Sequence, residues 1–467
     1  MTYKTISKLG ACVAIAAALS AQIPDFKPST PLLKAALTND APAMSNLLTA
    51  GANPNAGRFF GMPALTLAVI NNNTSMTKAL LSHGADPAAP DASGNTALMW
   101  SVGTDAPNPE IMELLLAKGA DANTKNNAGE SALTWAIRRG NMPAVARLKM
   151  AGASNEAAVR KAAESAIALL QKSGPQFVKV SGCASCHHQS LPQMLNGVAR
   201  KRGLAIDEPA AAQQLKAVMA MFRPIREQLA DGSITLPNLP ISVSYALLGL
   251  AAEGHAPDET TAAMAAAIVR TQRADGSFPV LPFRAPLEAS TVTGTAFSLR
   301  ALQLFAPNAG PQIAQARQWL AQAKPATNED HAMRLLGLYW ANAPKEQIDM
   351  AASTLVAAQR AGGGWAQLNN LEPDAYATGQ ALTALQLTGR AAANPTALEN
   401  GIAYLLRTQL ADGSWLVRTR SNPFQPLKES GFPHGRDQWI SASATSWAGM
   451  ALALSRPATP AAETEGN

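Results

Sequence analysis

Apolar positions in the first third of the chain recur with a fixed period. A leucine preceded by alanine or proline returns every 33 to 35 residues, and a glycine followed by alanine stands 19 to 21 residues after each leucine. Glycine tolerates the left-handed conformation that ends a helix, so the pattern predicts stacked pairs of short helices, each buried only against its neighbours. The leucines are Leu32, Leu65, Leu98 and Leu133, and the glycines are Gly51, Gly84, Gly119 and Gly152.

Two segments carry this period most clearly. Thr96-Ala97-Leu98 and the run from Leu114 to Asp121 resemble the ankyrin repeat closely. The resemblance covers four units within residues 25–155. It implies a concave surface that binds a protein partner, on a scaffold that is rarely an enzyme.

A different pattern recurs in the rest of the chain. Three residues separate a glutamine from a following glycine, and one further residue separates that glycine from a large apolar residue. An apolar helix precedes each glutamine, and an alanine-rich helix follows each loop. With two less regular units, the pattern predicts six helix pairs over residues 156–456, an all-α (α/α)6 toroid. The four regular glutamines are Gln228, Gln272, Gln359 and Gln409.

This loop pattern resembles the Gln–Trp repeat of squalene cyclases, whose relatives include the protein prenyltransferases. The resemblance implies a toroid whose cavity takes an apolar, isoprenoid-like ligand. The sequence has no adjacent aspartates, so it lacks the Asp-x-Asp-Asp acid of the hopene-type cyclases. No cysteine follows Cys186, so it also lacks the prenyltransferase zinc ligands. Because fold does not imply function, a toroid enzyme is the alternative hypothesis and not the leading one.

Aligning the second helix of each pair by its leucines places polar residues in two columns. We expect the first column to cap the helices and the second to line the cavity or bind within the first turn. Asp374 and His331 are catalytic candidates from these columns. Glu329 and Asp330 should interact with the positive end of their own helix and hold no proton for donation. The first column is Thr291, Thr327, Asp374 and Ser441, and the second is Thr295, His331, Thr378 and Thr445.

A further polar run precedes the last helix of the predicted toroid. It reads His434-Gly435-Arg436-Asp437. A loop with these side chains can bind an anion or transfer protons, and it can equally be a solvated turn. His434 and Asp437 complete the set of catalytic candidates.

The segment 174–190, inserted in the first helix pair, carries Cys183-Ala184-Ser185-Cys186-His187-His188. The motif resembles the covalent haem attachment site of c-type cytochromes. The resemblance implies haem c, with thioether bonds at Cys183 and Cys186 and His187 as an axial ligand of the iron. Zinc is an alternative, because the two thiolates and one or both of His187 and His188 could form a four-ligand site. A disulfide between the cysteines is a third reading.

Residues 1–22 combine Lys4 and Lys8 with a short apolar stretch and small residues near the end, which predicts a signal peptide. No later segment is long and apolar enough to span a membrane. We therefore expect an exported protein, periplasmic or extracellular, with a disordered tail at residues 457–467.

Charge changes this picture little. Lys and Arg exceed Asp and Glu by 38 − 32 = 6. No basic stripe with stacking aromatics is visible, so no nucleic-acid partner is expected. The leading hypothesis is an exported interaction or scaffold protein that carries a haem and takes part in electron transfer.

Overall fold

The computed structural model of the protein describes residues 29–182, 186–234, 236, 238–282, 284–422 and 428–457. This part of the chain is all-helical, as predicted, with isolated β-bridges and no strand. It divides into two compact units, one ending at Ala153 and one beginning at Ser154. The predicted signal peptide at residues 1–22 and the tail from residue 458 lie outside the described residues.

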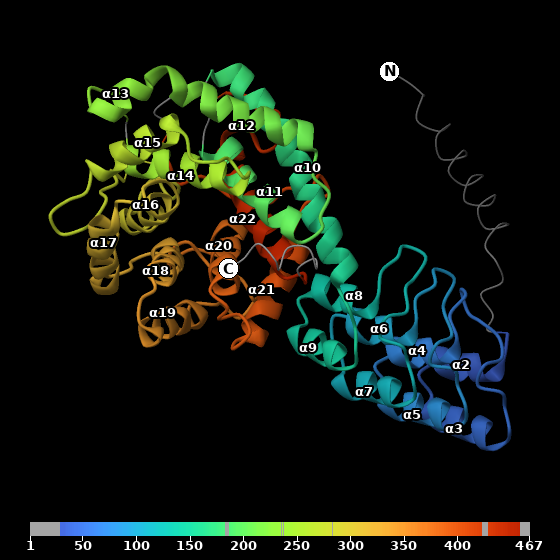
Figure 1. Cartoon of the computed structure of the whole chain (residues 1–467). Helices are drawn as coiled ribbons and strands as arrows, with labels where there is room; N and C mark the ends of the chain where they lie inside the picture. Colours follow the sequence, from blue (N-terminus) through green and yellow to red (C-terminus); the bar gives the residue numbers. More distant parts are fainter. Residues whose placement is uncertain are drawn as a thin grey trace, which may run out of the picture. The chain divides into compact units, whose positions relative to one another are not determined.

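The described part of the first unit contains short helices in two rows (Figure 1). Each helix of the first row contacts the next one in its row and its own partner in the second row. The first row is α2 (Pro31–Leu37), α4 (Ala64–Ile70), α6 (Ala97–Gly103) and α8 (Ala132–Arg139), and the second is α3 (Ala41–Thr49), α5 (Thr74–Ser82), α7 (Pro109–Ala117) and α9 (Met142–Met150).

Repeated polar residues set the bounds of the second-row helices. Each begins after an Asp or Asn whose side chain accepts a backbone N–H of the first turn, which satisfies an amide that the helix itself leaves unpaired. Each ends just before one of the four periodic glycines, whose φ angles lie between 84° and 87°. The predicted role of these glycines is confirmed. The capping residues are Asp40, Asn73, Asn108 and Asn141.

The second unit begins with the long helix α10 (Glu156–Ser181), so the segment that follows Gly174 continues as helix before a turn of π-helix at Cys186–Ser190. The remaining α-helices are α11 (Leu191–Lys201), α12 (Glu208–Phe222), α13 (Arg226–Asp231), α14 (Leu239–Ala252), α15 (Glu259–Val269), α16 (Thr291–Phe305), α17 (Gly310–Gln322), α18 (Asn328–Trp340), α19 (Lys345–Ala357), α20 (Ala375–Leu387), α21 (Pro395–Thr408) and α22 (Gln438–Leu454). Short 3-10 turns lie at Arg223–Ile225 and Gly435–Asp437.

Helices of this unit form a closed ring of contacts (Figure 1). Each contacts the next in the order α11, α14, α16, α18, α20 and α22, and α22 contacts α11 again. Helices α15, α17, α19 and α21 pack on the helices of this ring. We call the six the ring helices.

The recurring glutamines hold neighbouring helix pairs together. In three repeats the Nε2 atom donates two hydrogen bonds, one to the carbonyl of the loop glycine four residues on and one to a carbonyl of a neighbouring non-ring helix. The second acceptors are Gln312 on α17 for Gln272, Ala397 on α21 for Gln359, and Ala162 on α10 for Gln409, each at 2.9 Å.

The loop glycines are needed for the same contact. Gly276, Gly363 and Gly413 have φ angles of 92°, 87° and 89°. A Cβ atom on any of them would lie 2.4 to 2.7 Å from a carbonyl oxygen of the helix that the glutamine binds. The glutamine and glycine of the motif are therefore both interface residues.

The second predicted column fixes these loops as well. Thr295, Thr378 and Thr445 accept the backbone N–H of the large apolar residue that ends each loop motif. The donors are Phe278 at 3.0 Å, Trp365 at 2.9 Å and Trp415 at 3.2 Å. These three threonines hold the connections between helices and do not point a free hydroxyl into a cavity.

The first predicted column is right at two positions and wrong at two. Thr327 caps α18 and Asp374 caps α20, as expected. Ser290 caps α16 in place of Thr291, and α22 begins before Ser441. Thr291 and Ser441 instead accept loop amides, because the loop that precedes each of these helices packs against the first turn. The donors are Val280 and Val417.

Large side chains fill the space between the helices of the second unit. Phe297 and Trp447 are buried within the hydrophobic core, and Phe297 packs edge-on against Tyr245 at 4.8 Å between centroids. Among the described helices, none has the length and apolar character to cross a membrane.

Candidate functional site

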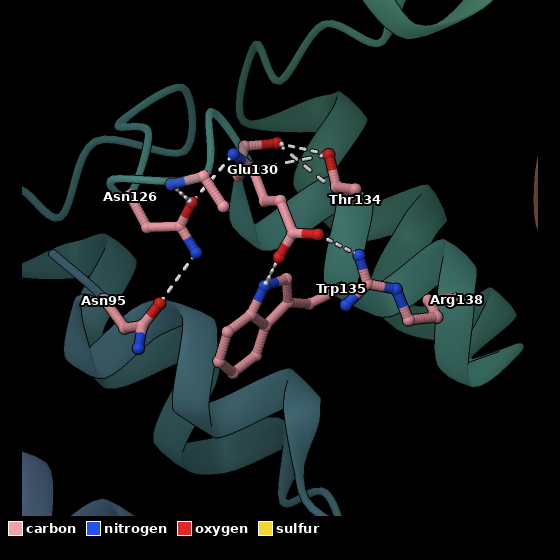
Figure 2. A network of polar contacts seen from close by, with 8 residues as sticks. Asn95, Asn126, Glu130, Thr134, Trp135 and Arg138 are labelled. Carbon is pink, nitrogen blue, oxygen red and sulfur yellow. Dashed lines mark hydrogen bonds and ion pairs between the residues drawn. The ribbon is translucent and has the colours of Figure 1, made fainter. Parts of the chain in front are cut away.

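The turns that precede the first-row helices of the first unit are joined by side-chain hydrogen bonds (Figure 2). Asn126 Nδ2 donates to Asn95 Oδ1 of the preceding turn at 2.7 Å. Asn126 Oδ1 accepts the backbone N–H groups of Ala128 and Glu130 in its own turn. These hydrogen bonds fix the positions of the two successive turns relative to each other.

Two tryptophans lie beside these turns. Trp135 on α8 donates from Nε1 to Glu130 Oε2 at 2.8 Å, and Arg138 pairs with the other oxygen of the same carboxylate (Figure 2). Trp100 on α6 donates from Nε1 to Asp91 Oδ2 at 3.0 Å. The two indoles pack edge-to-face with centroids 5.3 Å apart, and both are half-buried.

The contacts of Glu130 keep its carboxyl group ionised at neutral pH. Partial burial opposes ionisation of Glu130, but the hydrogen bonds from Arg138 and Trp135 outweigh it, so the pKa of the carboxyl is lowered. The indole of Trp135 is therefore held in one orientation with part of its ring accessible. Ordered, partly exposed aromatic rings are typical anchors of protein interfaces.

The predicted haem or zinc segment contains two buried histidines. The ring of His188 stacks on Phe177 with centroids 4.6 Å apart, and the ring of His187 stacks on Trp439 at 5.3 Å. The Nδ1 atoms of the two histidines are in hydrogen-bond contact, and His188 Nε2 lies 2.8 Å from Ser430 Oγ.

Burial keeps both imidazoles neutral. Desolvation lowers the pKa of His188 to about 3 and, together with the charges of His188 and Arg284, places the pKa of His187 well below its usual range. A neutral imidazole is the form that binds a metal. Cys183 and the side chain of Cys186 lie outside the described residues. Within the described ranges, no group of three or more His, Cys, Asp or Glu side chains is arranged to hold a metal ion.

His434 and Asp437 bind different partners. His434 Nε2 lies 2.7 Å from Oγ of Ser414, and burial lowers the pKa of this histidine despite nearby carboxylates. Asp437 is buried and accepts hydrogen bonds from Thr419 N at 2.9 Å and Arg418 Nη1 at 2.8 Å. These contacts hold the loop that follows α21 against the turn that precedes α22. Although the charge of Asp437 acts on His434, each of the two side chains is bonded to a different residue of that loop.

Of the other two catalytic candidates, Asp374 is explained by local structure. Asp374 caps α20 by accepting Ala377 N at 2.9 Å, and it accepts Gln367 Nε2 at 2.7 Å. Burial raises the pKa of Asp374 even though these bonds favour the carboxylate. His331 takes the column position that threonine occupies in three other repeats, and it forms no side-chain hydrogen bond with the described residues.

A carboxyl group outside the set of candidates has the more unusual environment. Glu329 on α18 accepts hydrogen bonds from Thr293 Oγ1 on α16 at 2.7 Å and from Tyr376 Oη on α20 at 3.0 Å. Burial raises the pKa of Glu329 to about 7. The expectation that this residue interacts with its own helix end and holds no proton is wrong, because its side chain points to the neighbouring ring helices.

Glu329 lines a small cavity of about 60 Å³ between the ring helices. Gln380 and Tyr376 on α20 line it too and are fully buried, whereas Arg420 at its rim is half-buried. The remaining lining residues are Pro286, Ala289, Ser290, Thr327, Asp330 and Gln367.

The leucine alignment contained the signal for this site. Two residues after Thr291, Thr327 and Asp374 it places Thr293, Glu329 and Tyr376 in one column. These three side chains are the ones that the structure joins by hydrogen bonds across three adjacent ring helices.

Comparisons with known proteins identify part of the first unit. The family model described as ankyrin repeats (3 copies) matches residues 32–126. A curated protein named mitochondrial disaggregase, from Homo sapiens, is 44% identical over 82 residues, which are 17% of this chain and 12% of that protein. The chain thus spans about an eighth of the length of that relative. Residues 32–126 are ankyrin repeats, and α8 with α9 adds a further helix pair to the array. Ankyrin repeats indicate a protein-binding scaffold.

Proposed function

We propose that the protein is an exported scaffold whose ankyrin repeats bind a protein partner and whose second unit is an (α/α)6 toroid carrying haem c. The ankyrin match and the half-buried pair Trp100 and Trp135 support the protein-binding part. The ring of helix contacts and the repeated glutamine–glycine interface support the cyclase-type toroid.

One observation carries the haem proposal. The two thiols of Cys183 and Cys186 precede His187 at the haem-attachment spacing, and the His187 imidazole is held between rings from two helices, Phe177 on α10 and Trp439 on α22. The donors suit haem: the thiols would form the thioether bonds and His187 would be an axial ligand. The haem would supply one-electron chemistry to the scaffold.

Expression of the full chain in a host that matures c-type cytochromes tests this proposal. We expect a haem-staining band on a denaturing gel, which disappears when Cys183→Ser and Cys186→Ser are combined. His187→Ala should retain covalent haem but change its absorption spectrum, while the exposed His83→Ala changes neither. If the purified protein contains stoichiometric zinc and shows no Soret absorbance, the haem proposal is wrong and a zinc site formed by Cys183, Cys186, His187 and His188 takes its place.

We propose export on the basis of residues 1–22. Fractionation of cells that express the full chain should place it in the periplasm or medium, and a chain that begins after residue 22 should remain in the cytoplasm. Equal distribution of both chains would contradict export.

A second candidate function is a toroid enzyme, which the Glu329 carboxyl favours. A buried group whose pKa is about 7 can donate or accept a proton at neutral pH. The isoprenoid-like substrate that the cyclase resemblance implies does not fit a cavity of about 60 Å³, so catalysis at Glu329 would require a small polar substrate. Turnover lost in Glu329→Gln and retained in Glu346→Gln, a variant of an exposed glutamate on α19, would establish this second function.

A further inference from the structure

The cavity at Glu329 holds a carboxyl group whose hydrogen bonds are incomplete. Oε1 accepts one bond from Thr293 and Oε2 accepts one from Tyr376. A carboxylate offers about four acceptor positions, so at least one position stays free even when the amide of Gln380 is counted as a third donor. The side chains of Thr293 and Tyr376 are fully buried and approach from two different helices, which fixes the carboxyl group in the cavity wall.

The charge in this cavity is also unbalanced. Glu329 and the adjacent Asp330 are both buried, and neither forms an ion pair with a described Lys, Arg or His. Asp330 is stabilised locally, because Oδ2 accepts the backbone N–H groups of Ala326 and Thr327 and Oδ1 accepts Ser290 Oγ. Glu329 has no such backbone donors.

Arg420 does not supply the missing charge. Its Nε donates to Gln367 Oε1 at 2.7 Å, and Gln367 Nε2 donates to Asp374 Oδ2 at 2.7 Å. The guanidinium is thus linked to the carboxylate of Asp374 at the rim of the cavity. A buried carboxylate normally has a partner of opposite charge, and Glu329 is left without one among the described residues.

Gln380 supplies an independent indication of a ligand. Its side chain is fully buried and lines the cavity, yet its Oε1 atom has no hydrogen-bond partner. Buried amides are nearly always satisfied, by protein or by a bound molecule. The amide N–H of Gln380 favours the carboxylate of Glu329, so Oε1 is the neutral acceptor of this side chain that is left for a ligand.

We propose that this cavity binds the primary ammonium group of a small ligand between Glu329 and Gln380. An ammonium group has a positive charge and three N–H donors in a compact volume. It would satisfy the free acceptor positions of Glu329 and the amide oxygen of Gln380 together. A quaternary ammonium has the same charge and no donor, so the site should discriminate between the two.

Binding should strengthen as pH rises through the pKa of Glu329. The charged or titratable groups around this carboxyl are Asp330 on its own helix, Tyr376 on the next helix, and Arg420 and Asp374 at the rim. Burial and, to a smaller extent, the charge of Asp330 oppose ionisation of Glu329, while the hydroxyls of Thr293 and Tyr376 and the amide of Gln380 favour it. A primary ammonium keeps its charge to about pH 10, so the carboxyl sets the pH dependence.

Isothermal titration calorimetry of the full chain with methylammonium chloride tests the proposal, with tetramethylammonium chloride as the probe that lacks N–H donors. We expect affinity for methylammonium to be at least about tenfold higher at pH 8 than at pH 5.5, since Glu329 changes from mostly protonated to mostly ionised. Tetramethylammonium should not bind. Glu329→Gln should abolish methylammonium binding, and Glu346→Gln should leave it unchanged.

Equal binding of both probes, pH-independent binding, or unchanged binding in a folded Glu329→Gln would overturn the proposal, as would no binding to the wild-type chain. If Glu329→Gln does not fold, the proposal is still tested by two properties of the wild-type chain: its preference for methylammonium over tetramethylammonium and the pH dependence of methylammonium binding. Because no haem takes part, loss of the haem proposal leaves this result unaffected.

Discussion

The Nε2 atom of Gln409 donates a hydrogen bond to the backbone carbonyl of Ala162, which precedes it by 247 residues, at a distance of 2.9 Å. This bond joins the end of α21 to α10. Gln272 and Gln359 make the equivalent bond between non-ring helices that are separated by one ring helix in the sequence, α15 with α17 and α19 with α21. The same type of hydrogen bond therefore joins consecutive helix pairs and also joins the last pair to the first helix of the unit.

We predict that Gln409→Ala lowers the free energy of unfolding of the second unit by about 1–3 kcal/mol, because two carbonyl groups lose their donor at a half-buried interface. Chemical denaturation monitored by tryptophan fluorescence measures the change. Gln213→Ala, at an exposed position of α12, is the matched control and should change stability by less than about 0.5 kcal/mol. Equal effects of the two substitutions would show that the closing bond contributes nothing.

We predict that Gly413→Ala destabilises the protein more than Gly389→Ala does. Both glycines have positive φ angles, 89° and 73°, so both substitutions introduce backbone strain of about 1 kcal/mol. A Cβ at Gly413 would also lie 2.7 Å from the carbonyl oxygen of Ser165, whereas a Cβ at Gly389 has nothing within 4 Å. The difference in melting temperature isolates the contact with α10. A smaller effect at Gly413 than at Gly389 would refute the interface role of the loop glycine.

The hydrophobic pattern predicted more of the fold than of the site, and the reason is physical. Helices and their ends depend on local residues, so the capping roles of Thr327 and Asp374 could be read from the sequence. The position of the first turn of α16 and α22 depends on loops that pack against them, which moved the caps away from Thr291 and Ser441.

The direction of a side chain within the ring was harder to predict. Glu329 begins a helix, and a helix start alone suggests a carboxylate that interacts with its own amides. The structure turns its side chain toward α16 and α20, where Thr293 and Tyr376 stand at matching positions. Comparing the columns of neighbouring ring helices would have revealed this, because the interaction lies between repeats and not within one.

We predict that acid destabilises the ankyrin unit through Glu130. Its pKa in the folded state is lowered, so its stabilising effect is complete above the unfolded value near 4.5 and is lost as pH falls through the folded value. Glu130→Gln should therefore be less stable than wild type at pH 7 and equal to it in acid. Melting curves between pH 7 and pH 3 measure this difference, with Glu110→Gln, an exposed glutamate on α7, as the control. A constant difference across this range would contradict the role of the charge.

We predict the opposite pH dependence for Glu329. Its pKa is raised to about 7, so the folded state binds the proton more tightly than the unfolded state does. Stability is then greatest below the unfolded value near 4.5 and declines as pH rises to 7. Glu329→Gln should remove this part of the decline, so its melting temperature relative to wild type should increase between pH 5 and pH 8. An unchanged difference between the two proteins over this interval would show that Glu329 titrates normally.

The same carboxyl leads us to predict that the protein does not cyclise squalene. Protonation of an alkene requires an acid much stronger than an ordinary carboxyl group, and burial has made Glu329 a weaker one. The cavity around it, of about 60 Å³, is also far too small for a folded thirty-carbon chain. Asp374 cannot replace it, because its carboxylate caps α20 and accepts Gln367 Nε2. Incubation of the purified chain with squalene, followed by gas chromatography, should return the substrate unchanged in the wild type, Glu329→Gln and Asp374→Asn alike. A cyclic product formed by the wild type and lost in either variant would contradict this prediction. It would show that the substituted carboxyl group is acidic enough to protonate an alkene.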